Sequence, residues 1–200
     1  VLKIKKHNSH SMTFCLDSTI IRPENNLEVK NAVILLHGYG GDGNDISVLS
    51  FNWKRHLPNT IFICPNGHEP CSINPSGFQW FDLTNDDPNY ILEQSIKAEK
   101  ILNKFIYEVK NEFNLENDKI CLSGFSQGCM MAINLGLISD QEYSCVIGFS
   151  GKIINQHNLK SRIKVSTKTL LIHGELDQVV TPNHMLEAKD FFISNNINIE

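Results

Sequence analysis

The chain has 200 residues and a mass of 22.7 kDa, with 41% hydrophobic and 20% charged residues, and a chain of this size buries roughly 70% of the surface that its unfolded form exposes. This composition predicts a single domain over residues 1–200 and excludes a disulfide mini-protein or a disordered tail. The 18 basic and 22 acidic residues nearly balance, so the chain lacks the excess positive charge that favours nucleic acid as a partner.

Short apolar runs alternate with longer helical patterns along the chain, which predicts a mostly parallel sheet with helices on both faces. The first 30 residues, with Phe14, Leu16, Ile20 and Ile21, predict an antiparallel entry to this sheet. The later strands are continuously apolar, as strands buried on both faces should be. They are predicted at residues 32–36, 60–64, 119–122, 145–149 and 169–172.

Three helices are predicted between and after these strands. The longest has roughly 20 residues with apolar side chains at three- and four-residue spacing, and it begins at Pro88 with Asp87 as its N-cap. A second helix follows Ser126, and a third follows the cap and proline pair Thr181 and Pro182.

The strongest chemical motif is Gly124-Phe125-Ser126-Gln127-Gly128, which joins a predicted strand to a predicted helix. A serine on such a tight turn takes a strained backbone conformation, and glycines two residues to either side avoid a collision. Its hydroxyl is then exposed at a helix N-terminus, which stabilises developing negative charge. Ser126 is therefore the predicted nucleophile. The alternative is a glycine-rich helix start with an incidental serine.

A nucleophilic serine also needs a histidine base and a carboxylate that orients the base. The chain order on this type of sheet is serine, acid, histidine, with the acid in a loop after a later strand. Asp177 follows the predicted strand 169–172 in that position and is the predicted acid. Glu175, Asp140 and Asp190 are competitors, the last two on surface-like helix or turn positions.

Glycines 38, 40, 41 and 43 follow the predicted strand 32–36. Such a run lets the backbone approach a ligand with its N–H groups inward, as an oxyanion hole requires. A nucleotide site is the alternative, but the spacing is not GxGxxG and no P-loop lysine is present.

Taken in order, residues 37–45, 65–83, 124–128 and 173–177 resemble the phospholipase/carboxylesterase family of α/β-hydrolases, which includes acyl-protein thioesterases. The resemblance implies an α/β-hydrolase fold and a serine esterase or thioesterase that forms an acyl-enzyme on Ser126, with Asp177 as the triad acid. It implies the backbone N–H groups of Tyr39 and Gln127 as oxyanion donors. It also implies that residues 70–83 form part of the substrate rim, with Trp80 as a wall of the acyl pocket; the alternative for Trp80 is a packed aromatic side chain that anchors a long loop.

The implied substrate is a small ester, a lysolipid or an S-acyl protein, and no metal or organic cofactor is implied. Two positions depart from the family pattern: Cys129 stands where a small residue is usual, and Pro182 comes one residue later than usual.

The resemblance places the triad histidine roughly thirty to forty residues after the acid, in a loop that follows one more strand. That position lies beyond Glu200. Among the eight histidines, His184 is the positional candidate, but it falls in the first turn of a predicted helix. We therefore expect a hydrolase fold that lacks its last strand and helix and is inactive as residues 1–200. The alternative is a non-catalytic ligand-binding or interaction module on a hydrolase scaffold.

The longest aliphatic run, residues 32–36, is far shorter than the ~20 apolar residues that a membrane span needs. The first residues show no signal-peptide core. The six cysteines are dispersed without a CxxC pair, which favours reduced thiols over disulfides. We therefore expect a cytoplasmic protein with no stable membrane insertion. Its oligomeric state is left open, although residues 197–199 are expected to form an unpaired strand edge.

Overall fold

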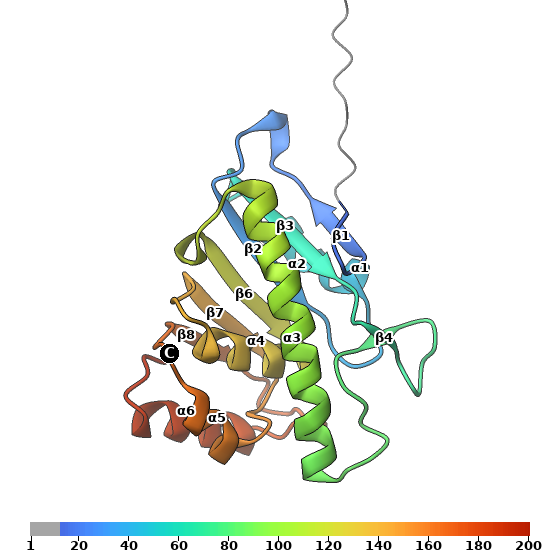
Figure 1. The fold of residues 1–200 in the computed structure, drawn as a ribbon, viewed down its shortest axis with the longest axis vertical. Coiled ribbons are helices and arrows are strands. Elements are labelled where there is room, and N and C mark those ends of the chain that lie inside the picture. The colour runs from blue at the N-terminus through green and yellow to red at the C-terminus, as the bar shows by residue number, and fades with distance from the viewer. Residues whose placement is uncertain (1–12) are drawn as a thin grey trace, which may run out of the picture.

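A computed structural model describes residues 13–200. Its centre is a six-stranded sheet of order β1-β3-β2-β6-β7-β8 (Figure 1), in which β1 is antiparallel to β3 and every other pair is parallel. The predicted mostly parallel sheet is confirmed. The strands are β1 (Ser18–Ile21), β2 (Asn31–Leu36), β3 (Thr60–Pro65), β6 (Ile120–Phe125), β7 (Cys145–Phe149) and β8 (Thr169–Ile172).

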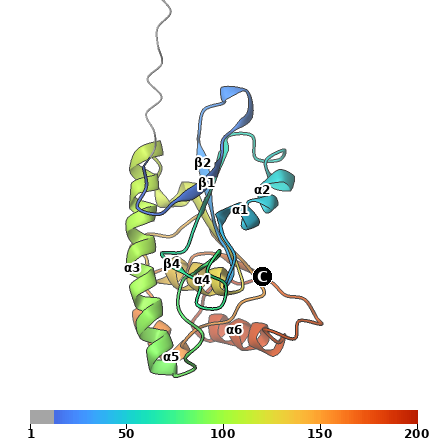
Figure 2. The same ribbon diagram turned by 90° about the vertical axis from the view of Figure 1, so that its right-hand side faces the viewer.

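Helices cover both faces of this sheet. Figure 2 shows the long helix α3 on one side and the short helices α1 and α2 on the other. A two-stranded pair, β4 (Glu69–Pro70) and β5 (Phe78–Gln79), lies outside the main sheet. The helices are α1 (Gly43–Ile46), α2 (Val48–Trp53), α3 (Pro88–Phe113), α4 (Gln127–Ile138), α5 (Gln156–Arg162) and α6 (Asn183–Ser194), with 3-10 turns at Glu24–Asn26 and Asn117–Lys119.

Alternation along the strands divides the apolar side chains between the two faces. In β2, Ile34 and Leu36 pack into the larger core beneath α3 and α4, whereas Val33 and Leu35 pack into the smaller core beneath α1 and α2. Because helices cover both faces, the central strands are apolar at nearly every position, which is why they read as continuous apolar runs in the sequence.

Helix α3 begins as the sequence predicts. The Asp87 carboxylate accepts hydrogen bonds from the backbone N–H groups of Asn89 and Tyr90, and Pro88 is the first helical residue. The helix has 26 residues, longer than expected, and ends where Asn114 takes a left-handed conformation (φ 51°).

A buried ion pair joins three helices on the α3 face. The carboxylate of Glu99 in α3 accepts hydrogen bonds from Arg162 Nη1 at 2.6 Å and Nη2 at 3.1 Å, and from Asn134 Nδ2 of α4 at 2.9 Å. Since Glu99 is almost fully buried, removing either partner would leave part of its charge uncompensated. The contact therefore holds α3, α4 and α5 in one arrangement.

The last residues lie along β8, at the end of the sheet. Thr169 N–H donates to the Asn198 carbonyl at 3.1 Å, and Leu171 N–H donates to the Glu200 carbonyl at 3.0 Å. The bridge between Thr169 and Ile199 is parallel. The expectation of an unpaired strand edge at residues 197–199 is wrong on the side that faces β8, where the Asn198 carbonyl accepts Thr169 N–H.

Two further observations bear on the nature of the chain. No helix within residues 13–200 is both long and apolar enough to span a membrane. All six cysteines are free thiols.

Candidate active site

Ser126 lies at the turn from β6 to α4, as the motif predicts. Its backbone has φ 53° and ψ −114°, a conformation that costs a residue with a side chain about 1–3 kcal/mol. The turn is held in place because Ser126 N–H donates to the Phe149 carbonyl at 2.8 Å. The strained serine stands at the carboxyl edge of the sheet, directly before the N-terminus of α4.

Two glycines permit this turn. A Cβ on Gly128 would overlap the Leu36 carbonyl oxygen and lie 2.6 Å from the His37 carbonyl oxygen. A Cβ on Gly124 would overlap the Gly128 backbone and lie 2.7 Å from the Cys129 nitrogen. Backbone segments therefore pass directly against both positions, and only glycine fits.

A cleft of about 650 Å³ opens in front of Ser126. It brings together all four residues for which sequence analysis predicts a catalytic or oxyanion role: Ser126, Asp177, Tyr39 and Gln127. Its remaining wall is mainly apolar, as a site for an acyl chain requires. The apolar lining residues are Phe81, Leu83, Pro88, Ile91, Phe125, Met130, Ile154, Val179 and Val180.

Asp177 is fixed by the loop that follows β8. One carboxylate oxygen accepts the backbone N–H groups of Val179 at 2.9 Å and Val180 at 3.0 Å. Hydrogen bonding from Val180, followed by smaller contributions from Val179, the Ser150 hydroxyl and His173, lowers the pKa of the Asp177 carboxyl against the opposing effect of burial. Asp177 is thus held as an ionised carboxylate, the form that orients and stabilises a protonated histidine.

The lowered pKa predicts a pH-dependent difference between the wild type and Asp177→Asn. Because the folded carboxyl has a lower pKa than the ordinary value of 3.8, folding favours its ionised form, and this contribution is present in full above the unfolded pKa. It disappears as the pH falls through the folded pKa. We expect Asp177→Asn to lower the urea midpoint at pH 7, with the gap closing towards about pH 3.

Asp190→Asn, at an exposed position of α6, serves as the control for this measurement and should show no such closing gap. A gap of constant size between Asp177→Asn and the wild type across the pH range would contradict the assigned role of the Val179 and Val180 hydrogen bonds.

Ser150 is a site residue that sequence analysis missed. It follows β7, has a left-handed backbone (φ 51°), and its N–H donates to the Ile172 carbonyl at 2.9 Å. Its hydroxyl donates to the Asp177 carboxylate, and it lines the cleft. The available signal was its place at the carboxyl end of a predicted strand, where parallel sheets gather functional residues.

The glycine-rich loop after β2 passes close to the nucleophile. A Cβ on Gly38 would lie 3.1 Å from Phe125 Cδ1 and 3.4 Å from Ser126 Cβ. The next residue, Tyr39, lines the cleft beside Ser126. Gln127 begins α4, where the first N–H groups have no partner within the helix. The backbone of both residues thus lies at the nucleophile, where an oxyanion hole requires donors.

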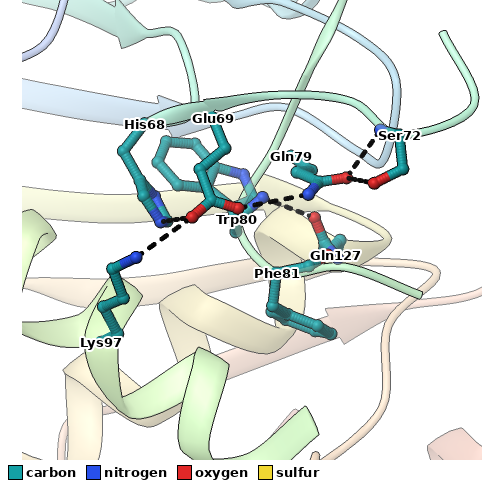
Figure 3. Close-up of polar contacts among 8 residues, drawn as sticks. All are labelled: His68, Glu69, Ser72, Gln79, Trp80, Phe81, Lys97 and Gln127. Carbon is teal, nitrogen blue, oxygen red and sulfur yellow. Dashed lines mark hydrogen bonds and ion pairs between the residues drawn. The ribbon is translucent and has the colours of Figure 1, made fainter. Parts of the chain in front are cut away.

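The side chain of Gln127 supports the wall of the cleft. Its carbonyl oxygen accepts Trp80 N–H at 2.8 Å, and its amide nitrogen donates to the Phe81 carbonyl at 2.7 Å. Figure 3 shows this bridge, with Trp80 and Phe81 on neighbouring positions of one loop. Both bonds are buried, so losing them would leave unsatisfied backbone groups.

Trp80 does not form part of the rim. It is 0% exposed, does not line the cleft, stacks on His37 with ring centroids 5.0 Å apart, and donates from Nε1 to the His37 carbonyl at 2.9 Å. Trp80 is therefore a packed aromatic side chain that anchors the loop, as the alternative interpretation of the sequence has it. The wall is formed instead by the next residues of the loop that face the cleft, Phe81 and Leu83.

A polar chain ties the same loop to α3 (Figure 3). Lys97 Nζ binds the Glu69 carboxylate at 3.2 Å, and Gln79 Nε2 donates to the other Glu69 oxygen at 3.3 Å. The Gln79 oxygen accepts Ser72 N–H at 3.0 Å. The loop that carries Phe81 is therefore fixed both at α3 and at the start of α4.

Comparison with known proteins identifies the family. A family model described as Phospholipase/Carboxylesterase matches residues 17–200. The chain belongs to this family. Among curated relatives in the family, acyl-protein thioesterase 1 of Candida albicans is 26% identical over 190 residues, covering 88% of this chain and 82% of the relative. Esterase YpfH of Escherichia coli is 28% identical over 169 residues, covering 81% and 68%.

Solved structures agree with this assignment to the phospholipase/carboxylesterase family. The crystal structure of esterase PE8 is 34% identical, with a TM-score of 0.87, and the match covers 92% of this chain and 86% of that one. The α/β-hydrolase fold implied by the sequence motifs is thereby confirmed.

The base of a phospholipase/carboxylesterase triad is not among the described residues that line the cleft. His37 Nε2 accepts Gly67 N–H at 2.8 Å and its Nδ1 donates to the Gly38 carbonyl at 2.7 Å, while burial lowers its pKa. His184 Nδ1 pairs with Glu187 on α6 at 3.0 Å. Both histidines are engaged by structural partners away from Ser126.

His173 comes nearest to the predicted acid, but its geometry is structural as well. Its side chain is 2% exposed, Nε2 donates to the Val180 carbonyl at 2.6 Å, and the same nitrogen lies 3.7 Å from the Asp177 carboxylate. Since this nitrogen is used by the loop, it is not available to accept the Ser126 proton.

Cys129, the third residue of α4, is a position where the chain departs from the family pattern, and the structure has room for its side chain. The Cys129 sulfur lies directly beside two glycines. A Cβ added to Gly148 would lie 2.5 Å from this sulfur, and a Cβ added to Gly151 would overlap it. Burial raises the pKa of the Cys129 thiol to about 12. Glycines at 148 and 151 therefore provide the space for a neutral, packed thiol.

Proposed function

We propose that the chain is a serine hydrolase of carboxylic esters or thioesters, with Ser126 as the nucleophile and Asp177 as the triad acid. The observation that carries the proposal is the single cleft that holds the strained Ser126, the ionised Asp177 and the backbone of Tyr39 and Gln127. Family membership and relatives named as esterases and acyl-protein thioesterases support it.

In this mechanism the Ser126 Oγ attacks the acyl carbonyl carbon while a histidine accepts its proton. The backbone N–H groups of Tyr39 and Gln127 would hydrogen-bond the oxyanion as charge develops on it. The histidine returns its proton to the leaving alcohol or thiol, and an acyl-enzyme remains on Ser126. Water then attacks the acyl carbon by the same route, releases the carboxylic acid and regenerates Ser126.

We further propose that a histidine following Glu200 in a longer chain supplies the base. Residues 198–200 run parallel to β8, and the carboxyl end of β8 leads into the Asp177 loop. A strand advances about 3.3 Å per residue, so a few more residues would bring this segment to the sheet edge where Asp177 lies. The order serine, acid, histidine places the base in that region.

The cleft favours a substrate with an apolar acyl group. Phe81, Met130 and Val180 are among its apolar lining residues, and Lys152 lines it as a cation. A small ester, a lysolipid or an S-acyl protein would fit this cleft, because each carries an acyl group that can contact the apolar wall and react by the same triad chemistry. The free state of all six cysteines supports action in the reducing cytoplasm.

The test uses two lengths of the protein, residues 1–200 and the same chain extended through about 30 further residues of its reading frame. We expect the extended chain to hydrolyse p-nitrophenyl acetate with a burst of p-nitrophenolate, the signature of an acyl-enzyme. The shorter chain should be slower by a factor on the order of 10⁶, as when the histidine alone is removed from a triad.

A butanoate ester and an S-acyl peptide, assayed in parallel, compare esters with thioesters on the same enzyme. Equal rates for the two chain lengths would contradict a base beyond Glu200. Binding of an acyl ligand without any turnover by the extended chain would instead favour a non-catalytic binding module.

A further inference from the structure

A second cavity lies on the opposite side of the sheet from the candidate active site. It measures about 560 Å³ and is reached from the α1 and α2 face, next to the amino-terminal ends of β6 and β7. Two cysteines belong to its wall: Cys121, the second residue of β6, and Cys145, the first residue of β7. The remaining wall is mostly apolar and includes Ala32, Val33 and Ile147.

The register of the sheet makes these two cysteines direct neighbours. Cys121 pairs with Cys145 across the parallel ladder between β6 and β7, and both side chains pack on the smaller of the two cores. Residues paired in this way project from the same face of a sheet, side by side. Cys121 is buried, whereas Cys145 is partly exposed in the cavity.

Hydrogen bonding divides the two thiols into a donor and an acceptor. The thiol of Cys121 hydrogen-bonds to the sulfur of Cys145, which is the main reason that the pKa of Cys145 falls to about 6. The Ser144 hydroxyl, 3.9 Å from the Cys145 sulfur, adds a second donor. The same contact, together with burial, raises the pKa of Cys121 well above its ordinary value. Cys145 is thus the thiol of the pair whose ionisation is favoured.

The charges around the pair favour the same state. His56 and Lys119 line the cavity, and the positive charge of Lys168 also lowers the pKa of Cys145. Each of these lysines has an acidic partner: Glu200 binds Lys168 Nζ at 3.1 Å, and Asp118 lies 3.7 Å from Lys119 Nζ. Lys168 is thus the cation that acts on the Cys145 sulfur, and a neighbouring cation is a feature of reactive cysteines.

The other cysteines whose pKa is shifted differ from Cys145. Cys15 is exposed as a residue. Partial burial of its thiol, together with the neighbouring Glu108 carboxylate, raises its pKa to about 11. Cys64 and Cys129 are buried, and burial raises the pKa of each to about 12. Accessibility and thiolate character coincide at Cys145.

We propose that Cys145, the partly exposed thiol of the cavity, is a thiol–disulfide exchange site for low-molecular-weight disulfides, with Cys121, its neighbour across the β6–β7 ladder, as the positioning residue. The Cys145 sulfur attacks one sulfur of the disulfide, so that a protein–ligand S–S bond forms and the original S–S bond breaks. The displaced thiolate leaves and takes a proton from water. One half of the reagent remains in the cavity as a mixed disulfide. This inference does not depend on the function proposed for Ser126.

The experiment uses the 200-residue protein and 4,4′-dithiodipyridine, whose released thiopyridone absorbs light. At pH 7 we expect one fast-reacting thiol, with the pyridyl adduct located on Cys145 by peptide mass spectrometry. The rate should rise with pH about a midpoint near 6, the pKa of Cys145. Cys145→Ser should lose the fast phase entirely, whereas Cys15→Ser, at the exposed cysteine, should retain it.

The role of Cys121 is tested by two further variants. Cys121→Ala removes the hydrogen-bond donor and should move the midpoint of the rate profile upward by roughly one pH unit. Cys121→Ser keeps a donor and should restore most of the shift. A fast phase that survives in Cys145→Ser, or label found first on Cys15, would overturn the exchange site. An unchanged midpoint in Cys121→Ala, with circular dichroism like that of the wild type, would overturn the positioning role.

Discussion

Replacing Ser126 by alanine is expected to abolish ester hydrolysis by the extended chain, with kcat falling on the order of 10⁶-fold. The loss is this large because Ser126 supplies the atom that forms the acyl-enzyme, so the remaining groups act only on an uncatalysed attack by water. The measurement is the steady-state rate with p-nitrophenyl acetate, together with stoichiometric labelling by a fluorophosphonate probe.

The fold should be little affected by this change. Alanine keeps the Cβ and the left-handed backbone of Ser126, so the free energy of unfolding should change by no more than about 0.5 kcal/mol. Ser161→Ala, which removes an exposed hydroxyl bonded to the Asn158 carbonyl of α5, is the matched control and should keep full activity. Equal rates for Ser126→Ala and the wild type would refute the esterase assignment to this site.

Replacing Gly128 by alanine should have the largest effect on stability. The added methyl group would overlap the Leu36 carbonyl and come within 2.6 Å of the His37 carbonyl; Leu36 is the last residue of β2, and His37 follows it directly. Neither side can yield without moving a central strand or the first turn of α4, so we expect a loss of about 3 kcal/mol or more. Urea unfolding followed by circular dichroism measures it.

Gly174→Ala is the control for this prediction, because a Cβ at Gly174 would meet nothing within 4 Å. It should unfold within about 0.5 kcal/mol of the wild type. In the extended chain, Gly128→Ala should also reduce hydrolysis, since Ser126 and Gln127 lie in the displaced turn. A Gly128→Ala protein as stable as Gly174→Ala would show that the turn tolerates a side chain.

The central strands and the nucleophile turn could be predicted because their signals are local. A strand buried on both faces is apolar at every position, and each predicted core strand is present within a few residues of its expected bounds. The Ser126 turn carries its own glycines, whose steric need is visible in the sequence. The long helix was predicted with its cap at Asp87, although its end at Asn114 was not.

Short elements left too little pattern to be predicted. Helices α1 and α2 have four and six residues, and the Asp42 cap of α1, which accepts Asp45 N–H at 2.8 Å, falls within a glycine run interpreted as an oxyanion loop. Helix α5 buries only Leu159, so it shows no apolar face. β4 and β5 have two residues each, below any detectable period.

The details of the site escaped sequence reasoning for a different reason. An irregular loop has no period, so nothing local indicates that Trp80 turns inward while Phe81 faces the cleft. Ser150 meets Asp177 across two strands of the sheet, a contact that no spacing along the chain encodes. Burial and long-range hydrogen bonds decide both positions, and they exist only once the chain is folded.

The double attachment of Gln127 has a consequence for how this enzyme can change. Its backbone begins α4, the helix that follows the nucleophile, while its side chain hydrogen-bonds to the backbone of both Trp80 and Phe81. A substitution at Phe81 that reshapes the wall of the cleft is therefore expected to displace Gln127 as well, the residue whose backbone N–H would donate to the oxyanion. Substrate preference and reaction rate are mechanically linked here, so variants with altered chain-length preference should change kcat as well as KM.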